Sequence, residues 1–385
     1  MSARPLTIIV GGMISAVPNQ GGWTWVILQY LLGLKQLGHD VYFVEVLPRK
    51  ALIPDGTTIA DSSNAAYFRQ VVSEFDLERN AALVLQETRE SVGLSYDDLR
   101  SVARRASVLL NVSGVLVDDA LIGTIPIRVY LDLDPAFTQI WQTQGIDMHF
   151  GQSTHFATVG LSIGSETCTA PTCGIQWIPT LQPIVLKQWP AGNGIVHDSL
   201  TTVANWRGYG SVEHDGVFYG QKAHSLRRFM QLPALTGEDF TLALSIHPDE
   251  RRDLDALESN GWRIVDPLRV AGTPAFYRSF VQESKAEFGI AKAGYVASNC
   301  GWISDRSICY LASARPVIAQ ETGFSRQLPT GEGIFAFRTA DEVLAAIDTL
   351  RTDYRRHSRA ARSLALEYFD SDKVLSTLLE RVGAS

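Results

Sequence analysis

One segment near the C-terminus constrains the fold of this chain more than any other. Within residues 283–325, a glycine loop at Gly301-Trp302 leads into a helix start at Ser304. The helix ends in small residues, and Arg315-Pro316 then leads into the apolar strand 317–319. A loop, a helix N-terminus and the end of the next strand therefore meet at one edge, which is where open α/β sheets bind phosphorylated ligands.

The same alternation of strands and helices runs through the whole chain. At 385 residues the chain is too long for one compact core, so we expect two domains of roughly 180 residues each. The apolar patterns predict strands at 6–10, 41–44, 107–112, 127–131, 155–159, 201–206, 241–245, 262–265, 287–291 and 317–319. They predict helices at 23–37, 64–75, 80–90, 96–105, 220–231, 250–259, 274–283, 340–351 and 354–382.

These patterns predict an α/β fold of two Rossmann-like domains that face a cleft. Each domain is a parallel sheet with helices on both faces, and a helical tail follows. Prolines and glycines interrupt the pattern near residue 180. The boundaries are residues 1–180 for the first domain, 181–198 for the linker and 199–360 for the second domain. The C-terminal helix, 361–385, packs back toward the first domain.

Composition limits the partners of the protein. The net charge is −7 and no basic stripe is present, which argues against a nucleic-acid partner. No apolar run is long enough to span a bilayer, and no signal peptide precedes the first strand, so we expect a cytoplasmic protein. Cys168 and Cys173 lack a second pair of ligands, so no metal site is expected. A homodimer is left open.

Two short motifs resemble those of GT-B glycosyltransferases. Residues 312–317, Ala-Ser-Ala-Arg-Pro-Val, resemble the donor segment of these enzymes, in which a helix ends in Ala-Ser-Gly-x-Pro-Val before a strand and a sugar-facing turn. Gly21-Gly22-Trp23, followed by Leu-Gly-His-Asp-Val at 37–41, resembles their opening unit. The resemblance, to a bacterial branch of the family 1/4-like superfamily, implies an acceptor domain at 1–180 and a nucleotide-sugar donor domain at 199–360.

The predicted phosphate end of the donor site is the helix start after Gly301 and Trp302. Ser304 is a plausible N-cap, which leaves backbone amides of the first turn free for an anion. Arg306 can bind a phosphate bidentately or be a surface residue. Asp305 either complements the helix dipole or fixes Arg306 or a ribose hydroxyl. The remaining residue of this turn is Ser307.

The resemblance also implies a cation for the diphosphate in the first strand-loop-helix of the donor domain. Arg207 and Lys222 occupy comparable positions, although Lys222 can equally be a solvated lysine at a helix start. His247 follows a strand and either lines the base or ribose pocket or is an ordinary loop histidine.

The predicted sugar end is the turn that follows the strand 317–319. A carboxylate and an amide beside a glycine suit the hydroxyls of a hexose, and the turn consists of Gln320, Glu321, Thr322 and Gly323. In one respect the chain departs from the family. Retaining enzymes often carry two glutamates separated by seven residues, and here these positions hold Gly301 and Cys309.

The first domain supplies the acceptor side. Its candidate loop residues are Gly12, Gly21, Gly22 and Trp23, and the loop lacks the histidine of the simplest inverting pattern. The candidate bases are Asp132, Asp134 and His155. Asp134 can alternatively cap a helix over 135–141, and His155 can alternatively be a packed histidine.

The function predicted is transfer of a sugar from a nucleotide-diphosphate sugar to a small-molecule or glycan acceptor. The nucleotide sugar is the co-substrate, and neither a cofactor nor a metal is expected. Two alternatives stay open. One is an epimerase or hydrolase of a nucleotide sugar on the same frame, and the other is a non-catalytic nucleotide-sugar or protein-binding module.

Overall fold

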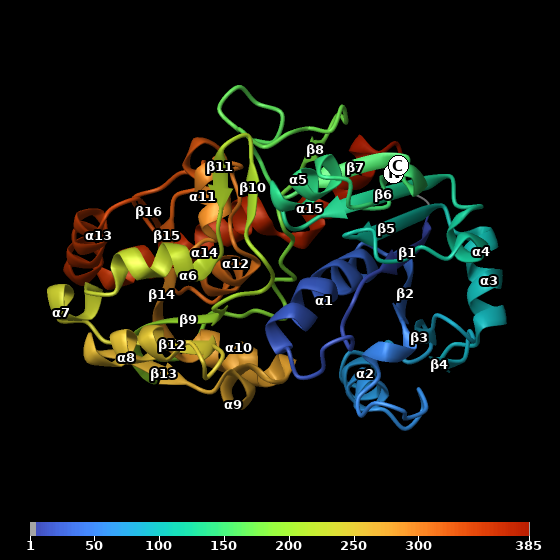
Figure 1. The fold of residues 1–385 in the computed structure, drawn as a ribbon, viewed down its shortest axis with the longest axis horizontal. Coiled ribbons are helices and arrows are strands. Elements are labelled where there is room, and N and C mark those ends of the chain that lie inside the picture. Colours follow the sequence, from blue (N-terminus) through green and yellow to red (C-terminus); the bar gives the residue numbers. More distant parts are fainter. Residues whose placement is uncertain (1–4, 385) are drawn as a thin grey trace.

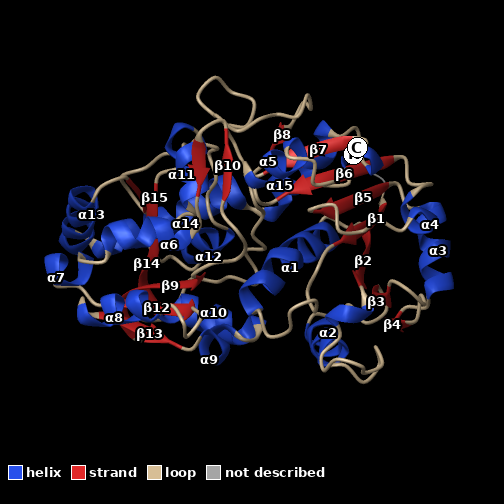
Figure 2. Ribbon diagram, viewed as in Figure 1, coloured by secondary structure: helices blue, strands red, loops and turns tan. Residues whose placement is uncertain are grey.

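The computed structural model describes residues 5–384 and contains two large sheets flanked by helices (Figure 1). Figure 2 shows the helices, in blue, around the strands of both sheets, in red. The predicted α/β fold with two Rossmann-like domains and a helical tail is confirmed.

The first sheet has eight strands in the order β4-β3-β2-β1-β5-β6-β7-β8. All its pairs are parallel except β3 with β4. The strands are β1 (Thr7–Gly11), β2 (Asp40–Leu47), β3 (Ala81–Leu85), β4 (Ser91–Gly93), β5 (Val108–Val112), β6 (Ile127–Asp132), β7 (His155–Thr158) and β8 (Ile178–Pro179). The helices are α1 (Gly21–Gln36), α2 (Ser63–Glu74), α3 (Tyr96–Arg105), α4 (Asp119–Ile122) and α5 (Phe137–Thr143).

The second sheet has six parallel strands in the order β13-β12-β9-β14-β15-β16. They are β9 (His197–Asn205), β12 (Phe240–Ser245), β13 (Trp262–Val265), β14 (Ser284–Gly289), β15 (Val317–Gln320) and β16 (Ile334–Phe337). A separate hairpin pairs β10 (Val212–His214) with β11 (Val217–Tyr219). The helices are α6 (Lys222–Leu226), α7 (Leu232–Thr236), α8 (Arg251–Ser259), α9 (Pro267–Ala271), α10 (Pro274–Glu283), α11 (Ala293–Ser298), α12 (Asp305–Ala312) and α13 (Ala340–Thr352).

The chain end is broken into three helical pieces, so the single helix predicted over 354–382 is wrong. The α14 helix (Tyr354–Leu364) runs into a π-helical turn, Ala365–Phe369. Asp370 then starts α15 (Ser371–Arg381) as its N-cap, because its side chain accepts a hydrogen bond from the amide of Asp372. The α15 helix packs against α1 of the first domain.

The helix predicted over 80–90 is also wrong. Its residues form β3, a turn and the start of β4. The five residues of β3 are all buried, and a short, continuously apolar run of this kind is compatible with either a strand or a helix. Parallel pairing with β2 makes this segment a strand.

The two domains share an apolar seam. Trp25 on α1 contacts Trp189 of the linker with ring centroids 5.0 Å apart, and its indole donates to the carbonyl of Pro274 on the second domain. Elsewhere on the seam, Phe137 and Trp177 of the first domain lie in one buried cluster with Tyr295 of the second. These contacts fix the two sheets relative to each other.

The loop between β1 and α1 is held by one buried carboxylate. Glu45, fully buried on β2, accepts hydrogen bonds from the backbone amides of Ile14, Ser15 and Ala16 and from the Ser15 hydroxyl. The loop reaches the N-terminus of α1, so Glu45 helps to position the first domain's side of the interdomain cavity described below.

Replacing Glu45 by Gln should lower the free energy of unfolding by about 2 kcal/mol, since an amide nitrogen cannot accept from the buried loop amides. Urea unfolding of the two proteins measures the difference. Glu87→Gln is the matched control, because Glu87 also accepts from a backbone amide, that of Arg49, but is exposed. Equal losses in both variants would contradict the role given to Glu45.

Candidate functional site

A cavity of about 610 Å³ lies between the two domains. The second domain supplies the carboxyl ends of β9, β12 and β13 together with the first residues of α6 and α12. The first domain supplies the start of α1 and the two residues before it. The lining includes Gly22, Trp23, Lys222, Asp266, Asp305 and Arg306.

Lys222 is the cation of this cavity that lacks a partner. The neighbouring cations Lys292 and Arg306 are paired with Asp134 and Glu287, and no carboxylate of residues 5–384 forms an ion pair with Lys222. Burial, with smaller contributions from Arg306 and Lys292, lowers the pKa of Lys222 to about 7. An anion bound in the cavity would supply the missing charge.

The N-terminus of α12 faces the same cavity. Ser304 is the N-cap, as predicted, and its hydroxyl accepts from the amide of Arg306 at 3.2 Å. Asp305 lines the cavity, and burial raises the pKa of its carboxyl group. Ser307 lies within the same first turn and is buried.

Arg306 is held differently from the free phosphate ligand that the sequence suggested. Its side chain is 7% exposed, its Nε donates to Glu287 on β14, and its Nη1 donates to the carbonyl of Val203 at 3.0 Å. The guanidinium is therefore fixed against the sheet, and Arg306 forms part of the cavity wall.

The N-terminus of α1 forms the opposite side of the cavity. This 16-residue helix has no side-chain cap at Gln20 and no acidic residue in its first turn. Gly22 lines the cavity, and Gly21 is packed so closely that a Cβ atom would lie 2.2 Å from the carbonyl oxygen of Thr273. The positive end of the helix dipole is thus directed at the same space as Lys222. The other predicted glycine, Gly12, is buried beneath Ile27 and Phe43.

A second polar cluster joins the domains beside the cavity. Asp134 follows β6, and both of its carboxylate oxygens accept from Lys292, which follows β14, at 3.0 and 2.9 Å. The hydroxyl groups of Tyr209 and Tyr295 also donate to Asp134. The Lys292 ammonium lies 4.1 Å from the centroid of the Tyr209 ring.

Lys292 and Lys222 flank one backbone contact. The amide of Ala293 donates to the carbonyl of Gln221 at 3.4 Å. Lys292 directly precedes Ala293 and Lys222 directly follows Gln221, so the two lysines are neighbours. The cluster around Asp134 therefore lies next to the cation of the cavity. The alternative role of Asp134 as a helix cap is wrong, because α5 begins at Phe137 with Ala136 in the N-cap position.

The other two predicted bases lie elsewhere. Asp132 is fully buried, and its carboxylate accepts from the amide of Asp134 and from Thr138, Gln139 and Thr158 at 2.7–3.0 Å. Burial raises its pKa, and its contacts hold the loop that carries Asp134. His155 is the first residue of β7, about 10 Å from the carboxyl end of that strand, so the structure does not bring it to Asp134.

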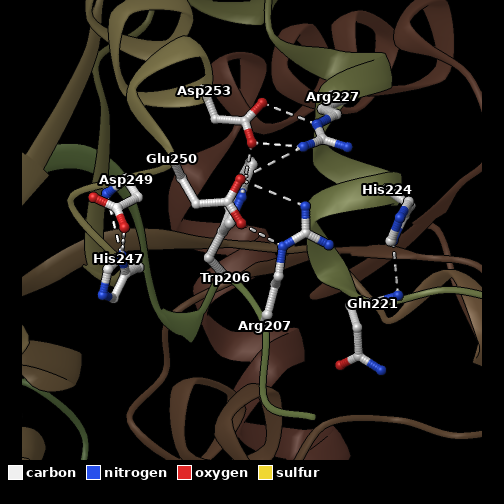
Figure 3. A network of polar contacts seen from close by, with 9 residues as sticks. All are labelled: Trp206, Arg207, Gln221, His224, Arg227, His247, Asp249, Glu250 and Asp253. Atoms are coloured by element: carbon white, nitrogen blue, oxygen red, sulfur yellow. Dashed lines mark hydrogen bonds and ion pairs between the residues drawn. The ribbon is translucent and has the colours of Figure 1, made fainter. Parts of the chain in front are cut away.

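Arg207 and His247 belong to an exposed network on the second domain (Figure 3). Arg207 points at Glu250, with which it forms an ion pair, and His247 lies 3.4 Å from the carboxylate of Asp249. The neighbouring pair, Arg227 with Asp253, is bonded at 2.6 and 2.9 Å. Neither Arg207 nor His247 lines the 610 Å³ cavity.

The predicted sugar turn is buried and is hydrogen-bonded mainly to the neighbouring backbone. Gln320 accepts from the amide of Ala291 at 3.2 Å, and the carbonyl of Thr322 accepts from the amide of Gly301 at 2.7 Å. Glu321 is 3% exposed and accepts from the amide of Gly323. Gln320 and Trp302 border a cavity of only about 10 Å³, so the turn does not present its side chains to the larger cavity.

Three residues of the cluster were missed by sequence reasoning. They are Lys292, Tyr209 and Tyr295, which contact Asp134 over 75 to 161 positions of chain. Lys292 carried a usable signal, since it follows a buried strand at the sheet edge where ligands bind. The tyrosines carried none, because their contact with Asp134 depends on how the two domains meet.

Among residues 5–384, no group of three or more His, Cys, Asp or Glu side chains is arranged to hold a metal ion. In the same range, no helix is long and apolar enough to cross a membrane. No protein-family model matches the sequence, and no curated protein matches it.

The chain is similar in structure to solved glycosyltransferases. An α-glucosyltransferase in complex with UDP and a 13-mer DNA superimposes with a TM-score of 0.62 at 11% identity, covering 98% of this chain and 99% of that one. HepE of Anabaena, in complex with UDP and glucose, gives 0.60 at 10% identity, covering 99% and 100%. AviGT4, from avilamycin A biosynthesis, gives 0.53 at 13%, covering 98% and 97%. The predicted resemblance to GT-B glycosyltransferases is thus confirmed at the level of the fold.

Lys292→Met should lower the free energy of unfolding by about 2 kcal/mol, because it leaves the partly buried Asp134 carboxylate without its cation. The double variant Asp134→Asn/Lys292→Met should recover more than half of that loss. Urea unfolding of the wild type, the two single variants and the double variant gives the coupling free energy between Asp134 and Lys292. Arg100→Met removes an exposed ion pair with Asp97 and serves as the control. Additive losses from Asp134→Asn and Lys292→Met would contradict the pairing.

Proposed function

We propose that the protein is a glycosyltransferase that binds a nucleotide-diphosphate sugar in the 610 Å³ cavity. Lys222 carries this proposal, because it is a cation without a carboxylate partner at the carboxyl ends of parallel strands. The size of the cavity falls within the range of small-molecule sites, and solved neighbours of the same fold contain UDP.

The diphosphate lies between Lys222 and the N-termini of α1 and α12. Each of these groups presents positive charge or free backbone amides to the cavity, so the phosphates are neutralised without a metal ion. The arrangement favours departure of the nucleoside diphosphate, since Lys222 stabilises the charge that develops on the leaving oxygen.

Asp305 takes the place of a missing carboxylate for the ribose. The resemblance expects a glutamate where Cys309 stands, but Cys309 is buried in the core. Asp305 lies one turn earlier on α12 and lines the cavity. The base then occupies the apolar part of the cavity, which is lined by Leu244, Ile246, Ile264 and Leu268.

Asp134 is the base for the acceptor. An acceptor hydroxyl gives its proton to Asp134, its oxygen bonds to the anomeric carbon, and the bond from that carbon to the phosphate oxygen breaks with its electron pair leaving on the diphosphate. Lys292 and the two tyrosines orient the carboxylate. The acceptor is a small molecule or a glycan held by the first domain. Four of the solved neighbours, all described as α-glucosyltransferase, contain DNA, but the net charge of −7 here disfavours a nucleic-acid acceptor.

Calorimetry with UDP, GDP, ADP and dTDP tests the donor assignment, and UDP is expected to bind. Lys222→Met should weaken that binding about 30-fold, since it removes a charge-assisted contact of about 2 kcal/mol. Lys50→Met, at an exposed lysine, is the control and should bind normally. If none of the four nucleotides binds the folded protein, the proposal is wrong.

The affinity for an intact nucleotide sugar should depend on pH through Lys222. A bound diphosphate raises the pKa of Lys222 above its ligand-free value of about 7. Affinity should therefore be full below pH 7 and fall by up to about tenfold per pH unit above it. Calorimetry between about pH 6 and 9 measures this, and Lys222→Met should abolish the dependence.

Asp134→Asn should reduce kcat about 100-fold or more while leaving donor affinity nearly unchanged, because the amide cannot accept the acceptor proton. His155→Ala is the matched control and should retain activity. Release of nucleoside diphosphate without any acceptor would instead favour the hydrolase alternative. Binding without turnover across acceptors, unchanged in Asp134→Asn, would favour the non-catalytic module.

A further inference from the structure

A second crevice, of about 400 Å³, lies where the chain crosses between the domains. It is lined by residues 178–181 at the end of the first domain, by Gln327 and Leu328 of the second, and by the start and face of α15. The linker and the segment that leads into α15 are bonded to each other here. The amide of Ile184 donates to the carbonyl of Phe369 at 2.7 Å, and the amide of Ser371 donates to the carbonyl of Ile184 at 3.0 Å. None of its lining residues lines the 610 Å³ donor cavity.

Most of the crevice wall is apolar. Its apolar lining includes Leu161, Leu181 and Leu328, together with Val374 and Leu378 of α15. Such a wall binds the hydrocarbon body of a ligand because burial removes apolar surface from water.

The charge of the crevice has one sign only. Its lining includes Lys373 and Arg381 but no Asp or Glu. Lys373 donates to the carbonyl groups of Leu366 and Glu367, and Arg381 donates to the carbonyl of Pro179 at 2.6 Å. Within residues 5–384 neither forms an ion pair, so both cations retain capacity for an anion although the whole chain carries −7.

We propose that this crevice binds an amphipathic organic anion, with an acyl or similar hydrocarbon body against the leucines and a carboxylate or phosphate head at Lys373 and Arg381. The backbone contacts of both cations hold them at the rim and leave their charge uncompensated. The site is separate from the proposed donor cavity and does not depend on the proposed reaction.

Calorimetry with octanoate, octyl phosphate, octanol and acetate tests the proposal on the full chain. Octanoate or octyl phosphate should bind at one site, and the comparison of the two identifies the head group. Octanol should bind at least about tenfold more weakly and acetate not at all, because neither the body nor the charge suffices alone. Failure of both anions to bind at millimolar concentration would overturn the proposal.

Two variants separate this site from non-specific binding. Lys373→Met/Arg381→Met should weaken binding of the anion at least about tenfold and leave the affinity for octanol unchanged. Leu328→Asp should abolish the binding of both the anion and octanol. Lys222→Met should leave the anion bound, and UDP should not displace it. Unfolding midpoints confirm that each variant is folded. Equal affinity in wild type and the double cation variant, or displacement by UDP, would contradict the assignment.

Discussion

Three cations converge where the two domains meet, and only two of them are paired. Lys292 is bound to Asp134 across the domain boundary, and Arg306 is bound to Glu287 within the second sheet. Lys222 forms no ion pair with a carboxylate, and burial, with smaller contributions from Arg306 and Lys292, lowers its pKa to about 7. The cavity also contains Asp305, whose charge favours the protonated form of Lys222.

Local sequence patterns specified most elements, and their boundaries were accurate where a cap marks them. The α10 helix starts after Thr273, whose side chain caps it, with Pro274 in the first turn, and its predicted limits agree with the structure at both ends. The prediction failed at β3, where an apolar run carries no period, and at Asp370, where a cap inside a helical pattern breaks the helix. In both places the outcome depends on a partner distant in the chain, β2 in one case and the isolated bridge from Ile184 to Asp370 in the other.

In the candidate site, too, local sequence patterns predicted the positions of residues better than they predicted the contacts of those residues. Position along strands located Lys222, the N-cap Ser304 and Asp134, because carboxyl ends of parallel strands share one edge. Residue type alone misled for Arg306, which is buried against Glu287, and for Glu321, which is buried and accepts from the amide of Gly323. The partners of a side chain depend on the tertiary fold, so residue chemistry alone could not show that Arg306 is already paired and that Glu321 is buried.

The seam between the domains implies that the 610 Å³ cavity is largely formed before a ligand arrives. Backbone groups cross the boundary directly, with the amide of Ser162 donating to the carbonyl of Cys300 at 2.9 Å and the amide of Thr169 donating to that of Ser298 at 3.0 Å. Gly301 is required at this contact, since it has φ +78° and a Cβ atom would lie 2.8 Å from the amide nitrogen of Ser162. A wide rotation of one domain would break these bonds and expose the aromatic cluster around Phe137. Because the walls are already in place, a ligand that enters this cavity loses less free energy to ordering the protein. Under the proposed function, Lys222 would then meet the diphosphate without a prior rearrangement of the domains.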